Sequence, residues 1–141
     1  MQLVGEYYHT LDAKNRVFIP SKHRDILGEN FMITRKIGEK CLAVYSSEEW
    51  EKFSEKLTQF PDSVVNKLKR FLYSKTIMVT PDAQGRIMLT PSLVEYANIE
   101  KNVAIIGCGD HAQIWAEGAW HDDELNLDND EMQDLLIKLG L

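Results

Sequence analysis

The chain has 141 residues, 44% of them hydrophobic and 27% charged, which is enough for one soluble domain with a buried core. No apolar run approaches the ~18 residues of a membrane span, and the N-terminus lacks the basic and apolar regions of a secretion signal. We therefore expect a cytoplasmic protein with no membrane partner. In that compartment Cys41 and Cys108 are expected to be packed thiols rather than a disulfide.

The net charge of −6 is concentrated at one end of the chain. Residues 121–141 hold seven acidic residues and one lysine, whereas residues 1–120 hold fifteen acidic and fifteen basic residues. A neutral body can still present one basic face. The acidic total therefore does not exclude a nucleic-acid partner.

The first third of the chain begins with two short strand patterns that flank a polar turn. Residues 7–11 and 16–19 are rich in β-formers, and residues 12–15 are typical of a turn, so the pattern predicts a β-hairpin with a charged tip. Pro20-Ser21 then predicts a helix that ends at Gly28. Two further strands are predicted over residues 31–34 and 41–45, joined by a turn around Gly38.

Two helices are predicted in the middle of the chain. Ser46 followed by Glu49 is a capping box, and the apolar side of its helix carries Trp50, Phe53 and Leu57. Pro61-Asp62 opens the next helix, whose apolar side holds Val65, Leu68 and Leu72 and whose other side holds Lys67, Lys69 and Arg70. We interpret these three cations as a solvated face.

The plan then repeats. Residues 12–21 read Asp-Ala-Lys-Asn-Arg-Val-Phe-Ile-Pro-Ser, and residues 82–91 read Asp-Ala-Gln-Gly-Arg-Ile-Met-Leu-Thr-Pro. The same offset relates Tyr45 to Trp115 and Trp50 to Trp120, which indicates a duplicated unit. The second copy predicts strands over residues 76–80, 86–89, 103–106 and 112–115, a helix over 91–97, and turns at 82–85 and 107–110.

The tail is predicted to contain one loop and one helix. Residues 121–130 have the composition of an acidic loop. Asp128 can cap a last short helix with Met132, Leu135, Leu136 and Leu139 on one side. Such a short helix is expected to be marginal unless it docks.

The repeated loop carries the functional hypothesis. Asp12 with Arg16, and Asp82 with Arg86, could form ion pairs that only fix the turn, and exposed pairs of this kind contribute ~0–1 kcal/mol. Arginine also offers a planar donor fork that matches phosphate or the guanine edge, and a two-stranded β-ribbon fits a DNA major groove. We therefore expect Lys14, Arg16 and Arg86 to contact DNA. Asp12, Asn15, Asp82 and Gly85 are expected to shape the loops, with Asn15 and Gly85 in a left-handed conformation.

These residues also resemble a known family. His9-Thr10-Leu11-Asp12, Lys14, Arg16-Val17 and Ile19-Pro20 are similar to the signature of the MraZ family, and the second loop, residues 103–107 and Ile114-Trp115 resemble that family's second half. The resemblance covers Met1 to about Trp120. The chain departs from the pattern where Asn15 replaces Gly, where Gln84 makes the second loop less basic, and where Thr90-Pro91 is expected to shift the entry of the second helix.

The resemblance implies a fold and a function. The expected fold is α+β, with two tandem AbrB/MraZ-like swapped-hairpin units forming a small β-barrel flanked by short helices. The expected units are residues 1–60, a linking helix at 61–75, residues 76–122 and an acidic tail at 123–141. The family resemblance implies a ring-shaped homo-oligomer associated with the nucleoid. It implies a transcriptional regulator that binds direct repeats in double-stranded promoter DNA upstream of the division and cell-wall gene cluster.

Other functions have weaker support in the sequence. An antitoxin-like or other protein-interaction module on the same fold is the alternative. No phosphate loop, zinc-protease or Cys-x-x-Cys motif occurs, so we expect no enzyme activity, cofactor, small-molecule substrate or metal. His111 and His121 lie near acidic residues but suit a turn and a loop better than a metal site. The three tryptophans, Trp50, Trp115 and Trp120, are assigned to the core or a subunit interface rather than to base stacking.

Overall fold

The computed structural model describes residues 1–141 as a mixture of eight strands and six helices. The first half contains β1 (Glu6–Thr10), β2 (Arg16–Phe18), α1 (Ser21–Leu27), β3 (Phe31–Arg35), β4 (Leu42–Ser46) and α2 (Ser47–Thr58). The remainder contains α3 (Asp62–Tyr73), β5 (Ile77–Val79), β6 (Arg86–Met88), α4 (Pro91–Tyr96), β7 (Asn102–Gly107), β8 (Ala112–Ala116), α5 (Glu117–Glu124) and α6 (Asn129–Lys138). The α+β class is confirmed.

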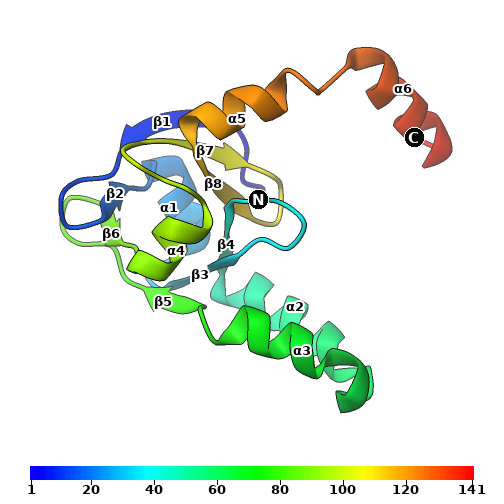
Figure 1. Cartoon of the computed structure of the whole chain (residues 1–141), viewed down its shortest axis with the longest axis horizontal. Coiled ribbons are helices and arrows are strands. Elements are labelled where there is room, and N and C mark those ends of the chain that lie inside the picture. The colour runs from blue at the N-terminus through cyan, green and yellow to red at the C-terminus, as the bar shows by residue number, and fades with distance from the viewer.

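Strand pairing joins the two halves of the chain (Figure 1). A six-stranded antiparallel sheet has the order β1-β7-β8-β4-β3-β5, and β2 and β6 form a separate two-stranded ribbon. The pairs β1–β7, β4–β8, β3–β5 and β2–β6 all connect the first half to the second. The β1 and β5 strands form the two ends of the large sheet.

The predicted first hairpin is wrong in its pairing. Residues 7–11 and 16–19 do form strands around a turn, but β1 pairs with β7 and β2 pairs with β6. The second loop behaves in the same way, because β5 pairs with β3. A local sequence pattern predicts which segments are strands and turns. It does not predict which distant strand each of them pairs with.

The helix boundaries follow local chemistry. Ser46 Oγ accepts a hydrogen bond from the Glu49 backbone N at 3.2 Å, as the capping motif predicts. Thr90 Oγ1 accepts one from the Leu93 N at 3.3 Å. The α1 and α4 helices begin at Ser21 and Pro91, which are equivalent positions of the repeat. The expected shift of the second helix start is therefore wrong, and Thr90 instead serves as the N-cap of α4.

The acidic loop predicted over residues 121–130 is wrong in its first half. Residues 117–124 form α5, which is anchored to the body by the buried Trp120. Trp120 packs edge-on against Trp115, with ring centroids 5.7 Å apart. Tertiary packing of one aromatic side chain therefore orders a segment whose composition is typical of a loop. The last helix, capped by Asp128, forms as predicted.

The main core is formed by residues of the large sheet, the ribbon, α1 and α4. It contains nineteen buried apolar residues, including Val17 of β2 and Ile87 of β6, so the ribbon is fixed to the body by packing. In Figure 1, α1 and α4 lie near the middle of the body, α2 and α3 project to one side, and α6 stands off at the end opposite β2 and β6. None of the helices has the length and apolar character of a membrane span.

Candidate nucleic-acid interface

The two repeated loops have the same hydrogen-bond plan. In the first, Asp12 Oδ1 accepts from the backbone N of Lys14 at 2.9 Å and of Arg16 at 2.8 Å, while Oδ2 accepts from Arg16 Nε at 2.7 Å. In the second, Asp82 accepts from the backbone N of Gln84 and of Arg86 at 2.9 Å, and from Arg86 Nε at 3.0 Å. Each carboxylate therefore shapes its turn and orients the arginine that follows. The loop-shaping role expected of Asp12 and Asp82 fits these contacts.

A left-handed residue closes each turn. Asn15 has φ 59° and Gly85 has φ 82°, and each donates its backbone N–H to the carbonyl of the loop aspartate, at 3.0 Å and 2.9 Å. Only glycine adopts this conformation freely, and asparagine tolerates it better than most residues. The substitution of asparagine for glycine in the first loop therefore leaves the loop geometry intact.

The β2–β6 ribbon brings the loops together. Arg16 is opposite Met88 and Phe18 is opposite Arg86 in the ladder. Two further backbone bonds tie each strand to the other loop: Ile19 N donates to Gly85 O at 3.0 Å, and Leu89 N donates to Asn15 O at 2.8 Å. Both arginines are thus carried by one rigid ribbon at one end of the molecule.

Electrostatics also connect the loops. Asp12 Oδ2 lies 2.7 Å from Arg16 Nε and 3.9 Å from Arg86 Nη1, so the first carboxylate faces both guanidinium groups. The hydrogen bond from the Arg16 backbone, helped by its side chain, lowers the pKa of Asp12, and Arg86 does the same for the pKa of Asp82. Both carboxylates are therefore ionised at neutral pH.

The cations keep capacity for an external ligand. About 30% of the Arg16 side chain and 31% of the Arg86 side chain are exposed, and each uses Nε for its aspartate. The terminal nitrogens of these two side chains form no hydrogen bond within the chain, and the exposed Lys14 forms no ion pair. The structure thus brings together all three residues for which we predict DNA contact.

Sequence reasoning missed a fourth cation beside these loops. Arg24 of α1 packs against Gly85 of the second loop, and its guanidinium carbon lies 5.2 Å from the Phe18 ring centre. The repeat gave no signal for it, because the equivalent position in the second half is Val94.

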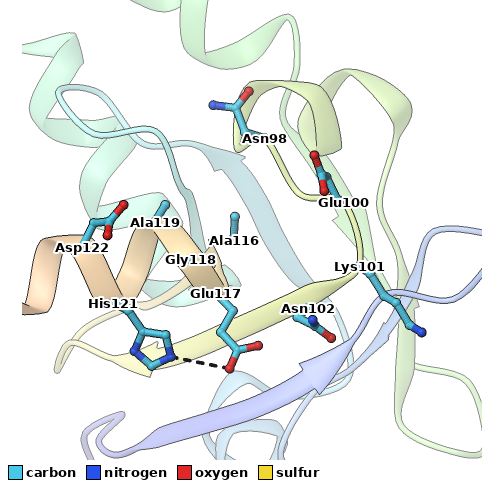
Figure 2. Close-up of a pocket in the computed structure, with 10 residues that line it drawn as sticks. All are labelled: Asn98, Glu100, Lys101, Asn102, Ala116, Glu117, Gly118, Ala119, His121 and Asp122. Carbon is cyan, nitrogen blue, oxygen red and sulfur yellow. Dashed lines mark ion pairs between the residues drawn. The ribbon is translucent and has the colours of Figure 1, made fainter.

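Neither a metal site nor a catalytic group of residues is found outside the two loops. No group of three or more histidine, cysteine, aspartate or glutamate side chains is placed to hold a metal ion. A cavity of about 530 Å³ beside α5 contains His121, whose Nε2 lies 3.5 Å from Glu117 Oε1 (Figure 2). Its other lining residues are mostly polar and include Lys101 and Asp122, and the cavity holds no second ion pair among the residues drawn.

The aromatic residues have structural neighbours. Trp115 and Trp120 are buried, and Trp50 packs with Phe53, Tyr45 and Tyr73 between β4, α2 and α3. The assignment of the tryptophans to packed regions rather than to base-stacking platforms is consistent with this burial.

Comparison with known proteins decides the family. The model of the MraZ family, described as an antitoxin-like MraZ protein, matches residues 3–70 and again residues 72–134. The chain belongs to the MraZ family. Its two matched segments correspond to the two copies of the loop, and the family membership accounts for the duplication seen in the sequence.

Curated relatives support this over almost the whole length. The chain is 42% identical over 134 residues to a transcriptional regulator MraZ of Dictyoglomus thermophilum, covering 94% of this chain and 90% of that one. It is 43% identical over 121 residues to the MraZ regulator of Dictyoglomus turgidum, covering 84% and 82%. It is 36% identical over 143 residues to that of Clostridium tetani, covering 98% and 99%.

Proposed function

We propose that this MraZ protein is a non-enzymatic, nucleoid-associated transcriptional regulator that binds double-stranded DNA through its paired loops. The observation that carries the proposal is the placement of two Asp–Arg loops with the same hydrogen-bond plan on one β2–β6 ribbon. A two-stranded ribbon fits the ~12 Å major groove of B-DNA, and an arginine fork can donate to guanine O6 and N7. The names of the relatives as transcriptional regulators support the same function.

The proposed operator is a set of short direct repeats upstream of the division and cell-wall gene cluster. One ribbon carries few cations, so a single subunit would bind weakly. A ring-shaped homo-oligomer would place several ribbons on successive repeats, and linked sites gain affinity through effective concentration. We also propose that the two halves are swapped-hairpin units, which the strand pairing between the halves supports, and that they form a small barrel; the six-stranded sheet itself is open, with β1 and β5 at its ends. Light scattering should give a multiple of the 16.2 kDa chain mass, and a monomer at micromolar concentration would contradict the ring.

The proposal is tested by mobility shift with a duplex from the region upstream of the chain's own gene and with a scrambled duplex of equal length. Arg16→Ala and Arg86→Ala should each cost roughly 1–3 kcal/mol and relax the preference for the repeat duplex. Arg16→Lys keeps the charge but not the fork, so it should retain binding to the scrambled duplex and lose preference. Arg70→Ala, an exposed arginine on α3, is the matched control.

Lys14→Ala should weaken binding to both duplexes alike and reduce the slope of log K against log salt by about 1, as for the loss of one phosphate contact. Lys67→Ala on α3 is its control. If Arg16→Ala folds and binds the repeat duplex with wild-type affinity and salt slope, the loops are not the DNA-reading surface.

The second candidate function is that of an antitoxin-like protein-interaction module, which the description of the matched family favours. In that case the wild-type chain would not shift either duplex, and the loop arginines would instead be required for capture of a protein partner. The mobility shift therefore separates the two functions.

A further inference from the structure

Arg24 belongs to the first half of the chain but lies on the loop of the second half. Its Nε donates to the Ile19 carbonyl at 2.9 Å, and its guanidinium carbon lies 5.2 Å from the centre of the Phe18 ring. These two contacts hold the side chain against the ribbon. Its guanidinium then covers the α-carbon face of Gly85.

The contact with Gly85 depends on the absence of a side chain there. A Cβ built on Gly85 would lie 2.7 Å from Arg24 Cζ, 2.9 Å from Nε and 3.0 Å from Nη1, all closer than or at the limit of real contacts. Any other residue would therefore push the guanidinium off the loop. In the first loop the equivalent position is Asn15, and the residue equivalent to Arg24 is Val94. The two loops thus differ as matched pairs, Arg24 with Gly85 and Val94 with Asn15.

The two loops differ in charge, and the position of Arg24 bears on that difference. The first loop carries Lys14 and Arg16 against Asp12, whereas the second carries only Arg86 against Asp82, because Gln84 replaces the lysine. Taken from the loop sequence alone, the second loop is neutral. With Arg24 lying on it, the second loop regains the second cation that Gln84 does not supply.

Arg24 also has no acidic partner within the molecule. None of the ion pairs of the chain includes it, although three acidic residues, Asp25, Glu29 and Asp82, line the adjoining surface hollow with it. Only its Nε forms a hydrogen bond, so the terminal nitrogens retain donors in a fork that matches a phosphate. We propose that Arg24 is the phosphate-contacting cation of the second DNA-binding loop, the functional counterpart of Lys14 in the first. This inference rests on the proposed DNA-binding function.

The test compares salt-dependent DNA affinity for Arg24→Met, Gln84→Lys and the double variant, with the same two duplexes. Arg24→Met keeps an apolar stem against Phe18, and its fold is checked by circular dichroism and thermal melting. We expect a loss of about tenfold on both duplexes at low salt and a decrease of about 1 in the salt slope. Gln84→Lys should restore both quantities in the Arg24→Met background, because it returns the loop's second cation.

A second variant displaces the Arg24 guanidinium without changing Arg24, for the case in which Arg24→Met lowers the melting temperature. Gly85→Asn uses a residue that tolerates positive φ, as Asn15 does, but its Cβ displaces the guanidinium, so it should reproduce the Arg24→Met loss. Gly38→Asn, at a glycine of positive φ whose Cβ position is open, is the matched control and should bind as the wild type. Combining Gly85→Asn with Arg24→Met should cause no further loss.

The outcomes separate this inference from the function on which it rests. Loss of binding in Arg16→Ala together with an unchanged salt slope in a folded Arg24→Met overturns the role of Arg24 alone. A loss of affinity in Arg24→Met that Gln84→Lys does not repair shows that Arg24 only shapes the loop, and also overturns it. Absence of any shift by the wild-type protein overturns the DNA-binding function itself.

Discussion

At the scale of single residues, the two loop aspartates differ in one contact. Asp12 faces Arg16 at 2.7 Å and Arg86 at 3.9 Å, whereas Asp82 pairs only with Arg86. The first carboxylate therefore orients both guanidinium groups of the ribbon. The duplicated sequence is symmetric at these positions, so this asymmetry comes from how the ribbon is assembled.

Asp12→Asn should therefore reduce DNA affinity more than Asp82→Asn. Both variants keep an oxygen that can accept from the loop backbone but lose the charge that holds an arginine. The change in thermal stability should be small for both, because the side chains of each pair remain about one-third exposed to solvent. Equal affinity losses in a mobility-shift titration would show that the 3.9 Å contact has no effect.

The pH dependence of the loops follows from the same carboxylates. Since the folded-state pKa values of Asp12 and Asp82 are below the ordinary 3.8, their stabilising contribution is complete above that value and is lost as pH falls through the lowered pKa. Between pH 5 and pH 8 the contribution of these two groups to stability should be constant. A melting-temperature profile of the wild type and the double Asn variant that diverges within this range would contradict the assignment.

The two cysteines should differ in reactivity. Both are free; Cys41 is fully buried and Cys108 is exposed. Burial raises the pKa of Cys41 to about 12 and, to a smaller extent, that of Cys108. A thiol reagent at pH 8 should modify Cys108 first and Cys41 only after denaturation, and equal rates in the native protein would show that Cys41 is accessible.

At the scale of elements, the N-terminal segment is held to the end of the β7–β8 hairpin. Leu3 and Gly109 exchange backbone hydrogen bonds at 2.8 Å, and Gly107 N donates to Gly5 O at 2.8 Å. A Cβ on Gly107 would lie 2.3 Å from the Val4 backbone nitrogen. Glycine is required here so that two backbones can approach each other.

Gly107→Ala should therefore destabilise the fold by about 1–3 kcal/mol, because backbone cannot move aside as a side-chain tip can. Gly118→Ala is the matched control. Gly118 has open space around its Cβ position in α5, and alanine there should be neutral or stabilising by up to ~1 kcal/mol. Chemical denaturation of both variants measures the difference, and equal stabilities would mean that the N-terminal segment is free to move away.

At the scale of the whole molecule, the loop end and the acidic end are separated. The ribbon lies at one end of the body and α6 stands off the other (Figure 1). The α6 helix has no buried residue, and its apolar side chains Met132, Leu135, Leu136 and Leu139 are all exposed. This helix contributes nothing to the core of a single chain.

Residues 128–141 should therefore be dispensable for folding and for specific DNA binding. The expected tail began at residue 123, but α5 extends through Glu124, so a truncation that ends at Leu127 preserves the packed helix. The truncated chain should melt at the wild-type temperature and bind DNA as well or better, because four acidic residues and one lysine are removed. A smaller particle in light scattering would instead assign the apolar side of α6 to a subunit contact.

Local residue patterns were sufficient to predict the two loops, several helix starts and the family. Repetition of Asp-x-x-x-Arg predicted two alike loops, and their internal bonds form as local chemistry requires, because each aspartate contacts backbone groups two and four residues away. The helix starts at Ser46 and Asp128 could be predicted because each of these side chains caps a backbone N–H two or three residues away. The family followed from the residues of these motifs.

The strand partners and the surroundings of the loops could not be predicted from local patterns. The partner of β2 lies about seventy residues away, and no local periodicity encodes it. The order of α5 depends on burial of Trp120, and the cation on the second loop comes from α1 of the first half. Contacts between distant segments depend on packing of the whole core, so the pairing of Arg24 with Gly85 exists only once the two halves have interlocked.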